Sequence, residues 1–384
     1  MNIDNFTYSV TSKQNISFEI LQTYDLFNFE NNTFNELKKF NFNNRRLIFI
    51  DRNIVEHYLK SIKEFLSHNN YDFHIVQIES SENSKNLDTL IEVLKEIEKF
   101  GLLRRAEPII AIGGGTLIDI IGLAASIYRR GVPYIKIPTT LVGLIDASVG
   151  AKTGINFEVR RNRLGSYFPP VASILDSKFL STLPDLEISS GMGEIIKISV
   201  IKDKELFDLI KLEGRDLLIN KFKNNENSNK IIRQSAVSMI DELKDNLWEL
   251  NLKRCVDFGH SFSPIIEMRS LLKNNNLKPL THGQAVSLDV LYSSIISYLR
   301  NKLSKLELDQ IFQVIKLFDL PTIHDGFLDY TNLLEALNDT MKHRNGNQYL
   351  PIPIEIGKYE FINDLTTEEI KMACKYMQDL NKTG

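Results

Sequence analysis

The feature that most constrains this chain is a regular alternation of short apolar runs and amphipathic stretches in its first half. Three runs have the length and composition of buried strands, and two longer segments between them carry apolar residues at helical spacing: residues 46–51, 73–78 and 108–112, and residues 54–66 and 87–100. Strands that alternate with helices build right-handed crossovers, so this half is predicted to be an α/β domain with a parallel sheet. Ligands of such sheets bind beyond the carboxyl ends of the strands, where Asp51 and the glycines after Ile112 stand.

The segment before the first run alternates apolar and polar residues more weakly. Phe18, Ile20 and Leu21 stand among polar neighbours. Short alternation of this kind is typical of paired strands. We therefore expect an opening hairpin ahead of the first buried strand.

The second half of the chain has a different pattern. From about Leu183 onward, apolar residues recur three and four positions apart, as in residues 285–295, which predicts helices. A chain of 384 residues is also long for one hydrophobic core. We predict an α/β domain over residues 1–182 and an α-helical domain over residues 183–384. Two polar stretches are expected to be exposed loops: residues 221–230 and 273–278.

Composition excludes several classes of partner. Charged residues make up 25% of the chain, but the net charge is −3, so no global positive field favours nucleic acid or an anionic membrane. No segment reaches the roughly 20 apolar residues that span a bilayer, and the first residues lack the basic start and apolar run of a secretion signal. Cys255 and Cys374 are too few for a disulfide framework. We expect a soluble cytoplasmic protein whose partners are small molecules.

Three consecutive glycines, Gly113, Gly114 and Gly115, follow the third apolar run and precede a helix. Glycine lets the backbone approach a bound pyrophosphate, and the free N–H groups of a helix N-terminus attract an anion. The motif differs from the GxGxxG fingerprint, so a bare structural turn is an equal alternative. Asp119 stands in the first turn of the helix, where a favourable interaction with the helix dipole is the simplest role.

A denser group of polar residues spans positions 128–156. It contains three short motifs: Tyr-Arg-Arg-Gly at 128–131, Pro-Thr-Thr-Leu at 138–141 and Asp-Ala-Ser-Val-Gly-Ala-Lys-Thr-Gly at 146–154. Small, hydroxylated and charged residues without apolar periodicity favour a loop that lines a polar site. Arg130, Lys152 and Asn162 are candidate phosphate ligands through charge-assisted hydrogen bonds, and solvated surface charge is the alternative.

The helical half carries a candidate metal set. Glu194 and Lys197 are three positions apart and share one helix face, where they could also form a simple surface salt bridge. His260 and His282 come from separate segments. One glutamate with two histidines is a catalytic zinc set that leaves a position open for substrate, but spacing alone does not separate such ligands from ordinary histidines. His343, in a basic patch, is a further candidate near a phosphate.

Taken in order, these motifs resemble those of dehydroquinate synthase. The shared motifs cover nearly the whole chain: Gly-Gly-Gly-x-x-x-Asp at 113–119, Tyr-x-Arg-Gly at 128–131, Pro-Thr-Thr-Leu at 138–141, Asp-x-Ser-Val-Gly-x-Lys-Thr-Gly at 146–154, Glu-x-x-Lys at 194–197, Gly-His at 259–260 and His-Gly at 282–283. The resemblance implies a Rossmann-like nucleotide-binding domain, an all-α C-terminal domain, a metal between them and a homodimer.

Three departures from dehydroquinate synthase bear on the substrate. Asp257 stands where that family has an asparagine, Pro264 where it has a second histidine, and Ser235 where it has a lysine. A site for a substrate carboxylate should gain cations rather than lose one and acquire a carboxylate. The expected substrate therefore carries no carboxylate.

The same segments resemble the 2-epi-5-epi-valiolone synthases, which act on sedoheptulose 7-phosphate. The resemblance rests on Val-Asp-Phe-Gly-His-Ser-Phe-Ser-Pro at 256–264, Asn-Arg-Leu-Gly-Ser-Tyr-Phe-Pro-Pro at 162–170 and Leu-Pro-Ile-Pro at 350–353. Synthases of 2-epi-valiolone or desmethyl-4-deoxygadusol use the same substrate and are the first alternatives, followed by 3-dehydroquinate synthase. The gadusol-type enzymes lack the aspartate found here at 257. Arg161 departs from the lysine usual in the family, and a planar guanidinium differs from a point charge.

The resemblance also implies a set of site residues. The residues expected to contact NAD⁺ are Asp51, Asn53, Glu82, Lys85, Gly113, Gly114, Gly115, Asp119, Thr139, Thr140, Asp146, Arg161, Phe179, Thr182 and Leu183. Zn²⁺ or Co²⁺ is expected on Glu194, His260 and His282. The residues expected to contact a sugar phosphate are Arg130 (from its own or the partner subunit), Asp146, Lys152, Asn162, Lys197, Asp257 and Lys342. The expected catalytic residues are Lys152, Asn162, Lys197, Asp257 and His260.

The implied reaction is a cyclisation without net oxidation. NAD⁺ takes a hydride from C5, phosphate leaves from C7, the hydride returns, and an intramolecular aldol step closes the ring. Such an enzyme is a carbon–oxygen lyase. A metal-dependent polyol dehydrogenase that releases NADH and a catalytically silent binding homologue are the rival functions. The motif at 146–154 and the basic residues around it argue against the dehydrogenase, because a neutral polyol needs no phosphate site. The silent homologue is disfavoured by the intact set Glu194, His260, His282, Lys152 and Lys197.

Overall fold

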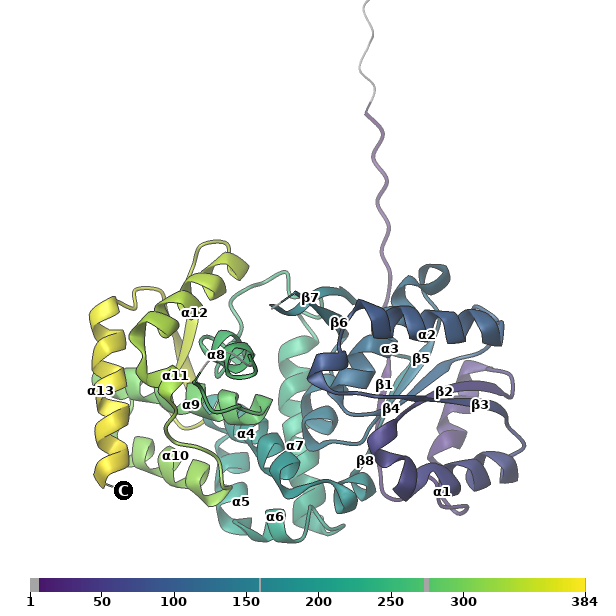
Figure 1. Cartoon of the computed structure of the whole chain (residues 1–384), viewed down its shortest axis with the longest axis horizontal. Helices are drawn as coiled ribbons and strands as arrows, with labels where there is room; N and C mark the ends of the chain where they lie inside the picture. Colours follow the sequence, from purple (N-terminus) through teal and green to yellow (C-terminus); the bar gives the residue numbers. More distant parts are fainter. Residues whose placement is uncertain (1–6, 159, 273–275, 384) are drawn as a thin grey trace, which may run out of the picture.

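The structure is a computed structural model that describes residues 7–158, 160–272 and 276–383. Two halves of different architecture lie side by side in Figure 1: an α/β half built from the first part of the chain and a helical half built from the second. Residues 7–18, the described part of the chain before the first strand, project away from both halves.

A six-stranded parallel sheet forms the centre of the first half, in the order β1-β8-β5-β4-β2-β3. The strands are β1 (Glu19–Thr23), β2 (Arg45–Asp51), β3 (Asp72–Ile78), β4 (Ile109–Gly113), β5 (Tyr134–Pro138) and β8 (Ala172–Asp176). The helices that cover it are α1 (Val55–His68), α2 (Leu87–Phe100) and α3 (Gly115–Ile127). Successive side chains point to opposite faces of a strand, so Phe49 packs with α2 and α3 whereas Ile50 packs with α1.

The predicted alternation is confirmed for β2, β3 and β4 and for α1 and α2. The predicted opening hairpin is wrong. Ile20 and Leu21 lie in β1, a strand that pairs in parallel with β8, with Ile20 opposite Ser173. Local alternation indicates that a strand forms, but it carries no information about a partner that lies far along the chain.

The segment 146–156, expected to be a loop, is only partly irregular. Gly143–Ala147 form a short π-helical turn, η5, and Lys152–Phe157 form β6, which pairs antiparallel with β7 (Arg160–Tyr167). Gly154 and Gly165 face each other across this pair, where the backbones approach too closely for a side chain. Glycine at positions 154 and 165 therefore allows the two strands of this hairpin to pack closely.

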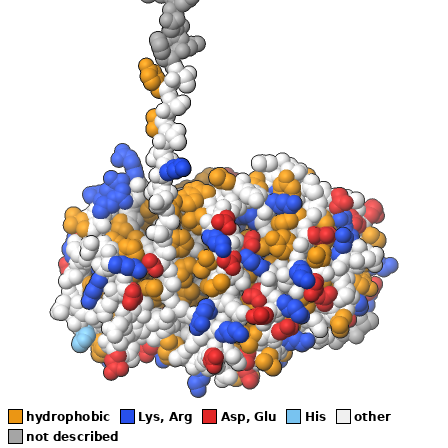
Figure 2. Space-filling model, turned by 180° about the vertical axis from the view of Figure 1, so that it is seen from behind, with side chains coloured by type: hydrophobic (Ala, Val, Ile, Leu, Met, Phe, Trp, Pro, Cys, Tyr) orange, Lys and Arg blue, Asp and Glu red, His pale blue; other side chains and the backbone are white. Residues whose placement is uncertain are grey.

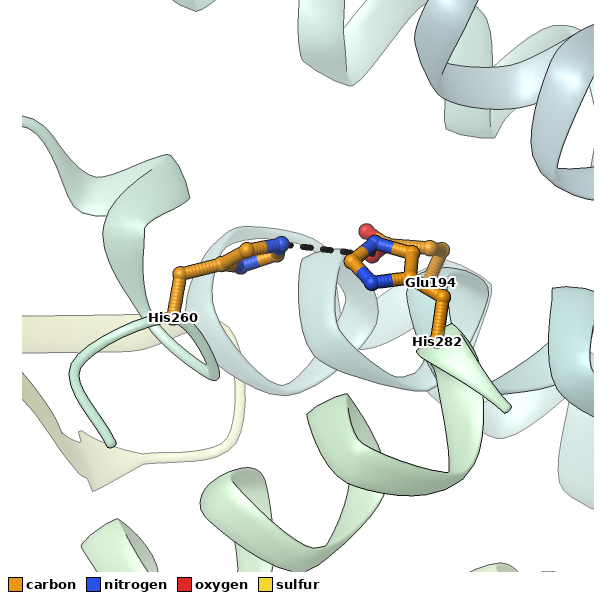
Figure 3. A group of neighbouring side chains, drawn as sticks. All are labelled: Glu194, His260 and His282. Atoms are coloured by element: carbon orange, nitrogen blue, oxygen red, sulfur yellow. Dashed lines mark ion pairs between the residues drawn. The ribbon is translucent and has the colours of Figure 1, made fainter. Parts of the chain in front are cut away.

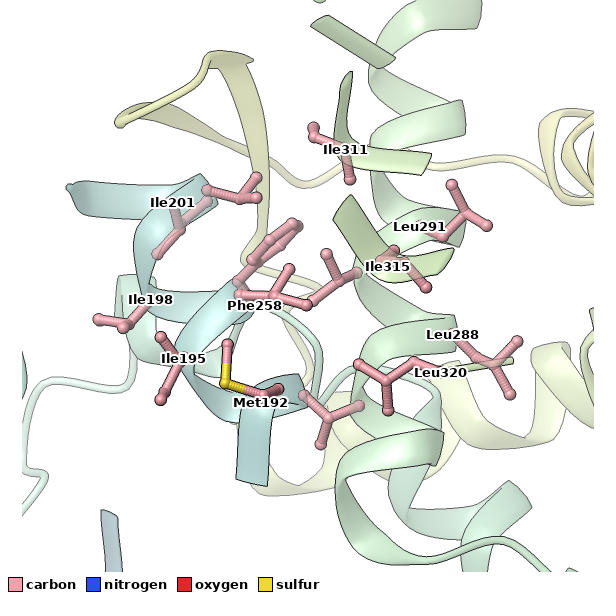
Figure 4. Close-up of a cluster of buried hydrophobic side chains, with 14 of the residues drawn as sticks. Met192, Ile195, Ile198, Ile201, Phe258, Leu288, Leu291, Ile311, Ile315 and Leu320 are labelled. Atoms are coloured by element: carbon pink, nitrogen blue, oxygen red, sulfur yellow. The ribbon is translucent and has the colours of Figure 1, made fainter. Parts of the chain in front are cut away.

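Helices make up most of the second half, as predicted. They are α4 (Asp185–Lys202), α5 (Lys204–Glu213), α6 (Asp216–Ile219), α7 (Glu226–Leu243), α8 (Ser263–Ser270), α9 (His282–Leu299), α10 (Lys305–Leu317), α11 (Asp325–Leu328), α12 (Tyr330–His343) and α13 (Thr367–Thr383). Buried apolar residues of α4, α9 and α10, among them Ile195, Leu291 and Ile315, form one core (Figure 4). A hairpin of β9 (Leu350–Glu355) and β10 (Lys358–Ile362) also lies in this half and was not predicted.

The two expected loops differ in outcome. Helix α7 begins at Glu226, so the second part of the stretch 221–230 is helical rather than a loop. Residues 273–275 of the other stretch lie outside the described residues. The domain boundary near residue 182 stays a prediction, and the chain passes there from the 3₁₀ segment η6 (Ser177–Thr182) toward α4.

The surface carries both signs of charge on the face shown in Figure 2, and hydrophobic side chains gather near the base of the N-terminal segment. Among the helices that the structure describes, none combines the length and apolar character needed to cross a membrane. Cys255 and Cys374 are both buried and free.

Candidate active site

The ends of five neighbouring strands bring most of the predicted nucleotide ligands to one edge of the sheet. Glu82 and Lys85 follow β3, Asp51 and Asn53 lie at the end of β2, and Gly113 to Gly115 lie at the end of β4. Thr139 and Thr140 follow β5, and Phe179, Thr182 and Leu183 follow β8. We call this set the nucleotide edge. Parallel strands all end on the same side, so these residues form one row. The N–H of Thr139 donates to the carbonyl of Gly113 at 3.0 Å and ties two strand ends together.

The glycines open helix α3 at the centre of the nucleotide edge. A Cβ on Gly113 would lie 2.6 Å from Cδ2 of Leu117 and 3.0 Å from Cβ of Asp51, and one on Gly114 would lie 3.1 Å from Cγ2 of Thr140. Gly114 is the N-cap of α3 and offers no side chain to cap the helix. The N–H groups of the first turn are therefore open to an anion, which fits a phosphate cradle.

Lys85 is a buried cation that joins the nucleotide edge to the β6–β7 hairpin. Its Nζ donates to Oδ2 of Asp119 at 2.7 Å and to Oδ1 of Asn162 at 2.6 Å. The N–H of Asn162, which has a left-handed backbone (φ 49°), donates to Oδ1 of Asn156 at 2.9 Å. Asp119 lies beyond the first turn of α3, contrary to the expectation, and is the ion-pair partner of Lys85. Asn162, predicted to bind phosphate, is held beside the predicted nucleotide ligands.

Glu194, His260 and His282 come from three elements and place one ligand atom each within 4.8 Å of one another (Figure 3). We call them the metal group. Glu194 lies in α4, His260 follows the turn η7 (Cys255–Asp257), and His282 is the first residue of α9. The Nε2 atoms of His282 and His260 lie 3.0 and 3.5 Å from Oε1 of Glu194. The structure therefore brings together three residues that sequence spacing could not join.

Close packing of α4 against α9 places two members of the metal group. Gly193 and Gly283 face each other, and a side chain on either would collide with the opposing backbone, at Gly283 or at Ser190. The start of α9 is fixed by a capping box in which Thr281 and Gln284 exchange hydrogen bonds. These two features set where the ring of the first helical residue, His282, lies.

The loop that carries His260 is held by a buried aspartate on α9. The N–H groups of Phe262 and Ser263 donate to Oδ2 of Asp289 at 2.7 and 2.9 Å. Burial raises the pKa of Asp289 to about 6, against the effect of these backbone hydrogen bonds. Asp289 therefore positions the backbone just after the histidine.

Burial and neighbouring charges set the protonation states of the metal group. Burial lowers the pKa of His260 to about 3, and the charge of Lys197 acts in the same direction. Burial also opposes the charging of His282, but Glu267 and Glu194 outweigh it and raise its pKa to about 9. The pKa of Glu194 falls well below its ordinary value because Lys197 and the histidines outweigh burial. The charged imidazole of His282 thus balances the carboxylates, a role that a bound divalent cation would take over.

The donor atoms of this group fit Zn²⁺ or Co²⁺. No described group donates a well-directed hydrogen bond to either oxygen of the buried Glu194, although Nζ of Lys197 lies 2.6 Å from Oε2. Nδ1 of His260 lies 3.3 Å from the carbonyl of Phe258, which can accept its proton and leave Nε2 for a metal. Two imidazoles and one carboxylate leave a position open for substrate or water on a tetrahedral ion.

Asp257 is held by two arginines. Arg254 contacts Oδ1, and Nη2 of Arg344 lies 3.1 Å from Oδ2. Burial raises the pKa of Asp257, but the two arginines outweigh it and lower the pKa, so this side chain is ionised. Arg254 also pairs with Glu249, which in turn pairs with Lys152. This network connects two predicted site residues, Lys152 and Asp257, through partners that the sequence did not mark.

Asp146, Ser235 and Glu194 line one small cavity. Burial, together with the charge of Glu194, raises the pKa of Asp146. The hydroxyl of Ser235 donates to the carbonyl of Ile231 at 2.8 Å. The described residues that line this cavity include two carboxylates and a hydroxyl but no lysine or arginine.

Two predicted phosphate ligands are not brought into contact with the rest of the site. Arg130 and Lys342 are exposed, and neither side chain forms a hydrogen bond or ion pair with another described residue. His343 is also exposed and lies 3.6 Å from Asp339. The basic residue of this patch that does reach the site is the buried Arg344.

Besides Asp289, the partners of the site that were not identified from the sequence include Glu249, Arg254, Glu267 and Arg344. The basic patch around residue 342 was a usable signal for Arg344, but which of its members faces inward depends on how α12 packs. Glu267 stands on α8 with no local mark of function. Its oxygen Oε2 lies 3.0 Å from Nδ1 of His282, which only the packing of α8 against α9 decides.

Two family models match most of the chain. The model described as 3-dehydroquinate synthase N-terminal matches residues 75–190, and the one described as 3-dehydroquinate synthase C-terminal matches residues 191–343. The 2-epi-5-epi-valiolone synthase of Streptomyces albus is 43% identical over 341 residues, which cover 88% of this chain and 82% of that protein. The demethyl-4-deoxygadusol synthase of Trichormus variabilis is 31% identical over 381 residues, which cover 97% of this chain and 90% of that protein.

A solved structure matches the whole architecture. ValA, the 2-epi-5-epi-valiolone synthase of Streptomyces hygroscopicus subsp. jinggangensis 5008 with NAD⁺ and Zn²⁺ bound, has a TM-score of 0.91 to this chain at 38% identity, and the match covers 97% of this chain and 100% of that chain. The predicted fold, a parallel α/β half followed by a helical half, is thereby confirmed. The matched family models and the 43% identity show that this chain belongs to the 3-dehydroquinate synthase family of sugar phosphate cyclases.

Proposed function

We propose that this protein is a 2-epi-5-epi-valiolone synthase, which cyclises sedoheptulose 7-phosphate and releases phosphate. The observation that carries the proposal is the ionised side chain of Asp257 three positions before the metal-group residue His260. A substrate carboxylate has no proton to donate to this side chain, whereas a sugar hydroxyl can donate a hydrogen bond to it. The identity to the valiolone synthase, 43% against 31% for the gadusol synthase, supports the same choice.

The nucleotide edge is proposed to hold NAD⁺. Asp51, a carboxylate at the end of β2, suits ribose hydroxyls, and the N–H groups at the start of α3 suit the pyrophosphate. The side chain of Thr182 lies 3.0 Å from the hydroxyl of Tyr58, which keeps the β8 end of the edge in place. When bound, NAD⁺ supplies a hydride acceptor whose hydride returns within the same turnover.

The metal group is proposed to hold Zn²⁺, with Co²⁺ as an alternative because one carboxylate and two imidazoles accept either ion. A metal in this position supplies Lewis-acid polarisation of a substrate oxygen. Lys197, fully buried against Glu194, keeps that carboxylate ionised and in place. Asp257 is proposed to accept a hydrogen bond from a substrate hydroxyl.

The β6–β7 hairpin is proposed to orient the phosphate of the substrate. Lys152 begins β6 and Asn162 lies in β7, and both can donate charge-assisted or neutral hydrogen bonds to phosphate oxygens. Arg130 and Lys342 are proposed to complete this contact when substrate is bound. Fixing both ends of an open-chain sugar is what an intramolecular ring closure requires.

We further propose a cytoplasmic homodimer with an α/β domain over residues 1–182 and a helical domain over residues 183–384. The two free, buried cysteines support a reducing compartment. The exposure of Arg130 supports a role across a subunit interface. Light scattering tests whether the protein is a dimer.

Mixing the inactive variants Arg130→Ala and Lys152→Ala tests whether Arg130 acts across the subunit interface. Activity recovers in the mixed dimer only if Arg130 of one subunit acts in the site of its partner.

The activity test uses the purified protein with sedoheptulose 7-phosphate, NAD⁺ and Zn²⁺. We expect stoichiometric phosphate release, no lasting absorbance of NADH, and a cyclitol that NMR identifies as 2-epi-5-epi-valiolone. Another cyclitol from the same sugar would favour a 2-epi-valiolone or desmethyl-4-deoxygadusol synthase. Accumulation of NADH without phosphate release would favour a polyol dehydrogenase, and binding without turnover would favour a silent homologue.

A further inference from the structure

Four side chains form a continuous line of contacts from the nucleotide edge to the metal group. Nε of Arg161, in β7, lies 3.0 Å from Oε1 of Glu82, which begins the short 3₁₀ segment after β3. Nη1 of the same guanidinium lies 2.5 Å from both oxygens of Glu267 on α8. Oε2 of Glu267 lies 3.0 Å from Nδ1 of His282. We call these four residues the bridge.

Glu267 is the member of the bridge that determines which nitrogen of His282 is free. A histidine that binds a metal through Nε2 keeps its proton on Nδ1, and that proton needs an acceptor. Two groups of the described residues approach Nδ1 of His282: Nη1 of Arg161 at 2.8 Å and the carboxylate of Glu267 at 3.0 Å. A guanidinium has no acceptor, so of these two groups only Glu267 can accept this proton. Nε2 then faces Glu194 at 3.0 Å, on the metal side of the ring.

Arg161 holds Glu267 in place for this role. Glu267 is 3% exposed, and Nη1 of Arg161 lies 2.5 Å from both of its oxygens. Arg161 is in turn held from two sides, because its Nε binds Glu82 and its Nη1 binds Glu267. A buried carboxylate that loses its partner is left uncompensated.

The identity of residue 161 matters for this geometry. A guanidinium presents several N–H groups in a fixed plane, so one side chain can bind two carboxylates that lie in different directions. The single ammonium of a lysine cannot reproduce both contacts at these positions. The arginine at this position, where the family usually has a lysine, therefore has a structural consequence. Arg161 contacts both Glu82, in the first half of the chain, and Glu267, in the second.

We propose that Arg161 and Glu267 are positioning residues that couple the binding of NAD⁺ to the binding of the metal ion. A nucleotide that fixes Glu82 fixes Arg161, which holds Glu267 and so presents Nε2 of His282 to the metal. Each ligand then orders side chains that the other needs, and by linkage each tightens the other by the same factor. The inference rests on the proposed function, which assigns Glu82 to NAD⁺ and His282 to the metal.

Zinc affinity of the metal-free full-length protein tests the proposal, measured by competition with a chromophoric chelator, without and with saturating NAD⁺. Calorimetric titration of NAD⁺, without and with Zn²⁺, gives the reciprocal quantity. For the unaltered protein we expect each ligand to tighten the other by about fivefold or more. Glu267→Gln is expected to weaken zinc binding by about 10- to 100-fold and to leave NAD⁺ binding to the metal-free protein unchanged.

The variant Arg161→Lys tests the coupling between NAD⁺ and zinc separately from the binding of zinc itself. Lysine keeps the positive charge near Glu267 but loses one of the two contacts, so the factor by which NAD⁺ tightens zinc should fall to about one. The matched control is Glu107→Gln, which changes a fully buried carboxylate bound to Arg45 at 3.0 Å. Glu107 precedes β4 and so lies at the opposite edge of the sheet. The control should keep both zinc affinity and coupling.

The outcomes separate this inference from the proposed function. The coupling role of the bridge is wrong, and the proposed function stands, if the unaltered protein cyclises its substrate but Glu267→Gln binds zinc as tightly as the control. The same holds if Arg161→Lys keeps the full coupling factor. If the unaltered protein binds neither zinc nor NAD⁺, the proposed function is wrong and the coupling role is wrong with it. Circular dichroism shows whether each variant is folded, and should Glu267→Gln fail to fold, Arg161→Lys and Glu267→Asp still decide the result.

Discussion

At the scale of single residues, the charged groups of the site are neutralised by partners from other parts of the chain. Asp257 lies between Arg254 and Arg344, and Lys152 pairs with Glu249. Buried charges are costly unless they are paired, so removal of one partner disturbs its neighbours more than removal of an exposed charge. Asp257 is the clearest case because both of its oxygens are engaged.

Asp257→Asn is expected to lower kcat/KM for sedoheptulose 7-phosphate by at least about tenfold. The amide keeps the shape but not the charge, and an interaction between a charged group and a hydroxyl contributes about 1.5–3 kcal/mol. Initial rates of phosphate release measure the effect. Asp364→Asn, which changes an exposed partner of Arg300, is the control and should keep full activity. Equal rates for both variants would remove the reason for placing a substrate hydroxyl at Asp257.

Lys136 is a fully buried cation beneath the segment that carries Asp146. Its Nζ donates to the carbonyls of Ala147 and Gly150 at 2.8 Å each. Burial lowers the pKa of Lys136 to about 8, against the opposing charges of Asp119 and Asp146. Because the unfolded chain holds this proton up to a higher pH than the folded protein, this group makes the fold more stable as the pH rises above about 8.

Lys136→Met should remove that pH dependence. Between pH 8 and pH 10, the free energy of unfolding of the unaltered protein should rise relative to that of the variant by about 2 kcal/mol, from the linkage of one proton across that window. Urea denaturation at several pH values measures both curves. Parallel curves would show that Lys136 titrates in the folded protein as it does in the unfolded chain.

At the scale of elements, the metal group depends on how closely α4 and α9 cross. Glycines at 193 and 283 let the two backbones touch, and the crossing sets the separation of Glu194 and His282. The core around these helices is closely packed (Figure 4). A small change at the crossing therefore moves the metal ligands as well as the core.

Gly283→Ala is expected to destabilise the protein by about 1–3 kcal/mol or more through overpacking. Alanine favours a helix over glycine by about 1 kcal/mol, so the collision with the backbone of Ser190 has to exceed that gain. Urea denaturation measures the change. Gly150→Ala is the control, since its added Cβ would meet no atom closer than 3.6 Å. A Gly283→Ala variant as stable as the control would mean that the two helices can separate freely.

At the scale of the whole molecule, the site lies where the two halves meet. The nucleotide edge belongs to the first half, the metal group to the second, and the β6–β7 hairpin contacts both through Arg161. Ligands that bind only the folded protein stabilise it by mass action. Occupancy of either site should therefore stabilise the assembled protein and not one half alone.

Removal of metal with a chelator is expected to abolish phosphate release and to lower the melting temperature. At a metal concentration about 100 times the dissociation constant, the lost stabilisation is about 2.7 kcal/mol. Thermal unfolding and phosphate assays, before chelation and after addition of Zn²⁺ or Co²⁺, measure both effects. A Glu194→Gln variant should show no stabilisation by either ion. Phosphate release that persists in the chelated protein would contradict the role of the metal group.

The sequence by itself determined the class of fold and much of the site. Apolar runs alternating with amphipathic segments are local patterns, and they specified β2 to β4 and the helices between them. Glycines before α3 and a residue order resembling dehydroquinate synthase identified Glu194, His260 and His282. Such features are readable because each depends on neighbours within a few positions or on motifs in a known order.

Tertiary structure alone decided which distant residues meet. The residues around Ile20 do not predict that its strand pairs with β8. The residues around Glu267 and Arg344 do not predict that Glu267 contacts His282 or that Arg344 contacts Asp257. Those contacts follow from how helices and strands pack, and packing depends on the whole core at once. The sequence therefore supplied the ligands, and the fold supplied the partners that orient them.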